Sequence, residues 1–99
     1  MKLEDWRNEI DSIDAEIVRL VNQRATVAKK IGVLKATAGL PIADADRETA
    51  VLRGVCGRSS GALGDASLVR IFRRILRESR LIQTKTVEQM AENKTGVQR

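Results

Sequence analysis

The sequence predicts an all-α protein with three helices, and this follows from its apolar periodicity, its turn residues and its composition. Between about residues 4 and 38, apolar positions recur at alternating steps of four and three, the spacing of a helical seam that packs against another helix. Only 2% of the residues are aromatic, so aliphatic side chains must form the core, which suits helices packed side by side. We expect one domain over residues 1–99, ordered from about 4 to 90.

The first predicted helix is long for a chain of this size. At about 1.5 Å per residue it extends roughly 50 Å, so we expect it to pack along a partner chain in an intertwined homodimer. Gly32 lowers the local helix propensity by about 1 kcal/mol without ending the pattern. Gly39 and Pro41 then end the helix, because glycine suits a helix C-terminus and proline blocks continuation. The seam consists of Trp6, Ile10, Ile13, Ile17, Leu20, Arg24, Val27, Ile31 and Leu34.

Two shorter helical segments follow. The second helix is expected to begin near Asp44, whose carboxylate can accept hydrogen bonds from free amide groups of the first turn. The glycine- and serine-rich stretch 54–61 predicts a loop. A third helix is expected from about Asp65, and the polar residues from Asn93 onward predict a frayed tail.

The charge and the scarcity of metal-binding residues restrict the function. The formal net charge of +5 favours anionic partners. A single cysteine and no histidine predict neither an internal disulfide nor a zinc site. The sequence has no signal-peptide pattern and no apolar run of about 18 residues, so we expect no membrane partner and a cytoplasmic location.

A few polar residues occupy positions where apolar ones belong. Arg24 lies in the seam of the first helix, and Lys35 follows eleven positions later, about 20° away around an ideal helix. On the third helix, Ser79 and Gln83 continue an apolar row four residues apart. An isolated buried guanidinium costs several kcal/mol, so Arg24 needs an acidic partner, which is either protein or ligand.

Each of these residues also has an ordinary interpretation when taken alone. Arg24 could pair with Glu48 or Asp44, or extend its charged end to solvent. Lys35 could be an exposed lysine favoured by the helix dipole, and the serine and glutamine of the third helix could be surface residues. A functional hypothesis therefore depends on the set of residues rather than on any one of them.

Three segments carry that set: WRNEIDSIDAEIVRLVNQRATVAKKIGVLKA, PIADADRETAVL and ILRESRLIQ. Over about residues 6–87 they resemble the all-helical class of chorismate mutases. Eight functional positions of that family occur in order, with matching spacing through the first helix and the turn. They are Arg7, Arg24, Lys35, Asp44, Arg47, Glu48, Ser79 and Gln83.

The resemblance implies conversion of chorismate to prephenate in phenylalanine and tyrosine biosynthesis. This intramolecular rearrangement needs no proton transfer, nucleophile, metal or cofactor. It needs a substrate held in a compact conformer and stabilisation of the negative charge that grows on the breaking ether oxygen.

The resemblance also assigns roles to the cationic residues. Arg24 and the partner chain's copy of Arg7 are expected to hold the two substrate carboxylates. Lys35 and Gln83 are expected to donate to the ether oxygen. Arg7 is 28 residues from Lys35, about 42 Å along a straight helix, so both can touch one substrate only if Arg7 comes from another subunit with an antiparallel first helix.

The remaining roles concern the turn and the third helix. Glu48 is expected to receive the substrate hydroxyl, and Asp44 to help at that end of the site. Arg47 is expected to brace Glu48 or a carboxylate. Ser79 is expected to line the pocket.

Several alternatives stay open at this point. An isochorismate-pyruvate lyase of the same fold would share the arginines, lysine and glutamine, although its pattern lacks the complete Asp-x-x-Arg-Glu run. A regulatory module could bind prephenate or a pathway enzyme without turnover, and such an enzyme could instead raise activity. A nucleic-acid-binding dimer is the third alternative, but its candidate surface has no aromatic stacking residues, so we expect no nucleic-acid partner. That surface consists of Arg70, Arg73, Arg74, Arg77 and Arg80.

Overall fold

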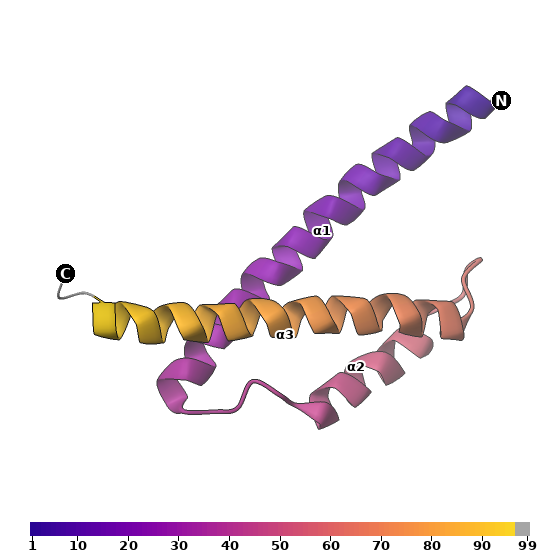
Figure 1. Cartoon of the computed structure of the whole chain (residues 1–99). Helices are drawn as coiled ribbons and strands as arrows, with labels where there is room; N and C mark the ends of the chain where they lie inside the picture. Colours follow the sequence, from indigo (N-terminus) through magenta and orange to yellow (C-terminus); the bar gives the residue numbers. More distant parts are fainter. Residues whose placement is uncertain (97–99) are drawn as a thin grey trace.

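The computed structural model describes the backbone of residues 1–96 and the side chains of residues 1–93. Within this range the chain forms three helices and no strand, which confirms the predicted all-α class. The helices are α1 (Leu3–Ala38), α2 (Ala45–Cys56) and α3 (Asp65–Gly96). The second half of α1 crosses α3, whereas its first half projects away from the other helices (Figure 1). α2 runs back along the first part of α3 (Figure 1).

The C-terminus of α1 lies where the sequence predicts it. Gly39 has φ 68° and ψ 27°, the left-handed conformation in which a side chain is disfavoured. The next amide, that of Leu40, donates to the carbonyl oxygen of Lys35 at 2.8 Å. Pro41 follows, and the chain turns toward α2. This ending fixes the last turn of α1, which carries Lys35.

The start of α2 also confirms a prediction. The Oδ1 atom of Asp44 accepts a hydrogen bond from the Arg47 amide at 3.0 Å, so Asp44 is the N-cap. The predicted loop from residue 54 is wrong for its first three positions, because α2 continues through Cys56. Val55 is half-buried and α2 packs against α3, so packing outweighs the low helix propensity of glycine.

α3 begins at Asp65, as predicted, and the Leu68 amide donates to the carbonyl of Gly64 at 3.1 Å. The helix continues to Gly96, beyond the limit of order expected near residue 90. The backbone is therefore helical over the first part of the predicted frayed tail. Its last residues, 97–99, lie outside the described residues.

A single chain encloses very little core. Among the described residues, Ala28 and Leu76 are the only buried hydrophobic ones. The accessible surface is 7990 Å², whereas a compact protein of 10.9 kDa exposes about 5,600 Å². The radius of gyration is 17.8 Å, against about 13 Å for a compact domain of this length. The eight apolar residues of the α1 seam are 41% to 63% exposed.

The outer helix surfaces carry charge. Arg19 donates to the exposed Glu16 three residues earlier, which lowers the pKa of the Glu16 carboxyl and raises that of Arg19. On α3, Arg74 pairs with Glu78 at 3.1 Å. In the part of the chain that the structure describes, no helix combines the length and apolar character needed to cross a membrane.

Candidate active site

A cavity of about 340 Å³ lies where the second half of α1, the start of α2 and the middle of α3 meet. Its walls contain seven of the eight residues predicted for the site, so residues far apart in the sequence converge on one space. Apolar side chains from all three helices form the rest of its surface. The lining residues are Arg24, Val27, Ala28, Ile31, Lys35, Ile42, Asp44, Arg47, Glu48, Val51, Leu76, Ser79, Arg80 and Gln83.

Arg24 enters the cavity from α1 and contacts α3. Its Nη1 atom donates to Ser79 Oγ, and Ser79 in turn donates to the carbonyl of Ile75 at 3.0 Å. Among the described residues, no carboxylate pairs with Arg24, so the alternative of an ion pair with Glu48 or Asp44 is not realised. A guanidinium has five N–H donors, and most of those of Arg24 therefore remain available to a ligand.

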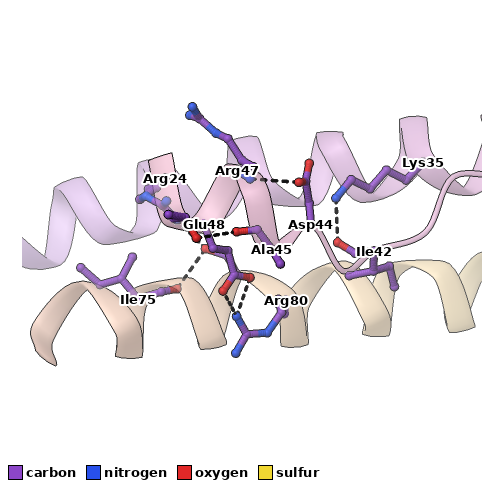
Figure 2. A network of polar contacts seen from close by, with 11 residues as sticks. Arg24, Lys35, Ile42, Asp44, Ala45, Arg47, Glu48, Ile75 and Arg80 are labelled. Carbon is purple, nitrogen blue, oxygen red and sulfur yellow. Dashed lines mark hydrogen bonds and ion pairs between the residues drawn. The ribbon is translucent and has the colours of Figure 1, made fainter. Parts of the chain in front are cut away.

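Lys35 folds back from the last turn of α1 toward α3. Its Nζ atom donates to the Ile42 carbonyl at 2.8 Å and to Gln83 Oε1 at 3.2 Å (Figure 2 shows the first of these). An ammonium group has three donors, so one is left to point at a ligand. Lys35 is thus half-buried rather than an exposed lysine at a helix end.

Gln83 is the most constrained polar residue of the site, with only 8% of its surface exposed. Because its carbonyl oxygen accepts from Lys35, the amide nitrogen is the end that can donate to a ligand. No acceptor among the described residues engages that nitrogen. Lys35 and Gln83 therefore form a pair of neighbouring donors held together by a hydrogen bond.

Gly32 permits the close approach of α1 and α3 that forms this pair. A Cβ atom at Gly32 would lie 3.1 Å from the Cα atom of Gln83, closer than ordinary carbon–carbon contacts. The sequence prediction for Gly32 covered only its cost in helix propensity. A stripe of small residues every three or four positions could have revealed its packing role: Ala25, Ala28, Gly32 and Ala36.

At the start of α2, the partner of Glu48 is not the arginine that the sequence predicts. Glu48 is paired with Arg80 of α3, which donates to both carboxylate oxygens (Figure 2). Arg47, which was expected to brace Glu48 or a carboxylate, lines the cavity but extends its side chain away from Glu48 (Figure 2). Asp44 caps α2 and also faces the cavity.

Arg7 is the one predicted residue that the chain does not bring to the cavity. It lies on the projecting half of α1, seventeen residues before Arg24, which is about 26 Å along the helix. No arginine side chain bridges that distance. In a single chain the site therefore contains seven of the eight predicted residues.

The electrostatic balance of the cavity favours an anion. Four cationic side chains and two carboxylates line it, which gives a formal net charge of +2. Three of the cations, Arg24, Lys35 and Arg47, have no acidic partner among the described residues. The cavity can thus hold a small dianion and direct N–H donors at its oxygen atoms.

The comparisons with known proteins agree on one family. The family model described as "Chorismate mutase type II" matches residues 6–84. A bifunctional chorismate mutase/prephenate dehydratase of Neisseria gonorrhoeae is 47% identical over 72 residues, which cover 73% of this chain and 19% of that protein. A chorismate mutase of Methanocaldococcus jannaschii is 28% identical over 91 residues, covering 89% of this chain and 90% of that protein.

A solved structure agrees with these sequence relatives. The structure of chorismate mutase (form II) from Thermus thermophilus superimposes with a TM-score of 0.83 and 27% identity, covering 85% of this chain and 96% of that chain. The present chain spans about a fifth of the length of the bifunctional relatives that it matches in N. gonorrhoeae and Aquifex aeolicus.

Proposed function

Because the chain belongs to the chorismate mutase type II family, we propose that it converts chorismate to prephenate in the synthesis of phenylalanine and tyrosine. The observation that carries this proposal is the cavity with a net charge of +2, in which Lys35 and Gln83 place two N–H donors side by side. Chorismate has two carboxylates and an ether oxygen on which negative charge develops. The net positive charge of the cavity matches the two carboxylates, and the two N–H donors match the ether oxygen.

In this mechanism the protein supplies orientation and electrostatic stabilisation. Arg24 holds one carboxylate, because its planar fork can form two parallel hydrogen bonds. Lys35 and Gln83 donate to the ether oxygen as the carbon–oxygen bond breaks. An acceleration of about 10⁶ requires about 8 kcal/mol of transition-state stabilisation. Oriented donors and selection of the compact conformer are each worth several kcal/mol, so together they can supply this amount.

The carboxylates of the cavity suit the substrate hydroxyl. Glu48 is a hydrogen-bond acceptor that lines the cavity, and Asp44, the cap of α2, lines it as well. We assign the hydroxyl to Glu48, with Asp44 nearby. Arg47 binds a carboxylate, since its side chain extends away from Glu48 (Figure 2). Ser79 holds Arg24 in place by accepting its hydrogen bond.

The working form in this proposal is a homodimer whose α1 helices run antiparallel. The single chain exposes about 2,400 Å² more surface than a compact protein of its mass. That excess is the size of surface that obligate homodimers bury. The apolar seam of α1, half exposed along its whole length, supplies the contact. In such a dimer the partner's copy of Arg7 reaches the cavity and binds the second carboxylate.

Mixing two inactive variants tests the shared site. Arg7→Ala and Lys35→Ala each damage every site of their own homodimers, whereas a heterodimer has one site with both residues intact. A mixture of equal amounts, unfolded and refolded together, should recover about a quarter of the wild-type rate. Arg24→Ala mixed with Lys35→Ala is the control, since both residues line the cavity within one chain and no intact site can form. Equal recovery in both mixtures, or in neither, contradicts the shared site.

The proposed activity itself is tested with chorismate and the purified chain, without additives. We expect loss of the ultraviolet absorbance of chorismate and formation of prephenate. Isochorismate supplied in parallel identifies the alternative lyase, because pyruvate and salicylate would appear instead. A chain that is folded and dimeric but leaves chorismate unchanged contradicts the proposal.

A pathway enzyme is the remaining proposed partner. The N. gonorrhoeae relative is named for both chorismate mutase and prephenate dehydratase, and this chain matches 19% of its length. We infer that an enzyme consuming prephenate acts beside this chain, as a partner or in the same polypeptide. A cytoplasmic location stays a prediction from the sequence.

A further inference from the structure

One arginine of α3 differs from its neighbours. Arg73 and Arg77 are exposed on the helix surface, whereas Arg80 is half-buried, lines the cavity and contacts Glu48 of α2. The side chains of Arg80 and Glu48 are 41% and 28% exposed, respectively. Such a pair is partly shielded from solvent, so its charges act more strongly than those of a fully exposed ion pair.

The geometry of this pair fixes the Glu48 carboxylate. The Nη1 atom of Arg80 donates to both Oε1 and Oε2, so the arginine lies across the end of the carboxylate (Figure 2). A carboxylate has about four lone-pair directions, and this contact uses two of them. The other two remain for a donor in the cavity. Arg80 thus orients Glu48 without blocking it as an acceptor.

The pair also reduces the electrostatic repulsion between Glu48 and an anionic ligand in the proposed site. Glu48 is an anion in a cavity that is proposed to take a dianion, and like charges repel at this range. The other charged groups that line the cavity are Arg24 and Lys35 on α1, Asp44 at the N-cap of α2, and Arg47 on α2. Among the described residues, Arg80 is the only cation paired with Glu48.

We propose that Arg80 is a positioning residue, which orients Glu48 toward the substrate hydroxyl and cancels its charge so that a dianion can bind. This inference rests on the proposed function. Cancellation of charge acts on the substrate and the transition state alike, so its loss raises KM more than it lowers kcat. A purely structural tie between α2 and α3 has no such preference.

The test compares Arg80→Gln, Glu48→Gln and the double variant in chorismate turnover. Arg80→Gln leaves Glu48 as an unpaired anion, and we expect KM to rise about tenfold while kcat stays within about threefold. In the double variant the repulsive charge is gone, so KM should fall back to within about threefold of that of Glu48→Gln. Arg80→Lys retains the charge and should keep KM within about threefold of the wild type.

Arg77→Gln is the matched control, because it removes the same charge from an exposed position one turn earlier on α3, outside the cavity. Its KM should stay within about twofold of the wild type, which separates the local effect from the general loss of positive charge. Circular dichroism and the dimer mass are measured for every variant, so that a folding defect is seen directly.

Two results overturn the inference while the proposed function stands. One is a KM for Arg80→Gln within about twofold of the wild type, and the other is a KM in the double variant as high as in Arg80→Gln or higher. A wild-type chain without chorismate turnover overturns the proposed function first, and this inference with it.

Discussion

Replacing Gly32 with alanine should affect the stability of the protein and the geometry of the site to different extents. The added Cβ atom would lie 3.1 Å from Gln83 Cα and 3.4 Å from Gln83 Cβ, whereas carbon atoms pack best at about 3.5–4.0 Å. The nearest neighbour is a backbone atom of a helix, which cannot rotate away. α1 and α3 must therefore move apart by about 0.5 Å.

Two opposing terms set the effect of Gly32→Ala on stability. Overpacking costs about 1–3 kcal/mol, and the higher helix propensity of alanine returns about 1 kcal/mol. We expect the free energy of unfolding to fall by about 0–2 kcal/mol. Activity should suffer more, because Gln83 moves relative to the substrate. Misplacement by about 1 Å costs about 100-fold, so a shift of half that size should lower kcat about tenfold.

Gly54→Ala is the matched control for this experiment. Gly54 lies within α2, and a Cβ atom there meets nothing within 4 Å. It should stabilise the protein by about 0.5–1 kcal/mol with unchanged turnover. Urea unfolding at one fixed protein concentration and chorismate consumption provide both measurements. A Gly32→Ala variant that behaves like Gly54→Ala, more stable and equally active, refutes this reasoning.

Three further predictions concern the donor, the cap and the dimer. Lys35→Ala should lower kcat by about 10²–10³, the loss typical for one donor to a developing oxyanion, and near-full activity would contradict its assignment. Asp44→Ala should lower the unfolding free energy by about 1 kcal/mol in urea titrations. Asp44→Asn should change it little, because asparagine also caps helices. Equal losses in the two variants would exclude capping as the cause. If the helices are antiparallel with Arg7 near the partner's cavity, the two-fold axis lies near the seam residue Ile17. On mild oxidation, Ile17→Cys in a Cys56→Ser background should form a cross-linked dimer on a denaturing gel. Ala15→Cys, about 160° away around the helix, should not. Cross-linking at both positions or at neither contradicts this arrangement.

Much of the fold could be predicted because its signals are local. Gly39 and Pro41 end α1, and Asp44 begins α2, through interactions within a few residues of the chain. The spacing of Arg24 and Lys35 along one helix also fixes their relative direction before any packing is known. For Arg24 and Lys35, helix geometry predicted a shared side of α1, and the family resemblance assigned both residues to the site.

The unpredicted features depend on how the helices dock. Five arginines follow one another on α3, and only the packing of α2 decides that Arg80 faces inward toward Glu48. The contact between Gly32 and Gln83 likewise requires the crossing point of α1 and α3. Local propensity predicted the wrong end for α2, because it includes the cost of Gly54 but not the packing of α2 against α3.

The projecting first half of α1 links the folding of the protein to its assembly. Residues 3–20 are exposed at every position and extend beyond α3 (Figure 1). A helix without tertiary contacts is only marginally stable in water. In the proposed dimer, the second subunit therefore completes the helix and delivers the missing arginine in one event. Folding, assembly and the onset of catalysis then share a single concentration dependence, and dilution should reverse all three together.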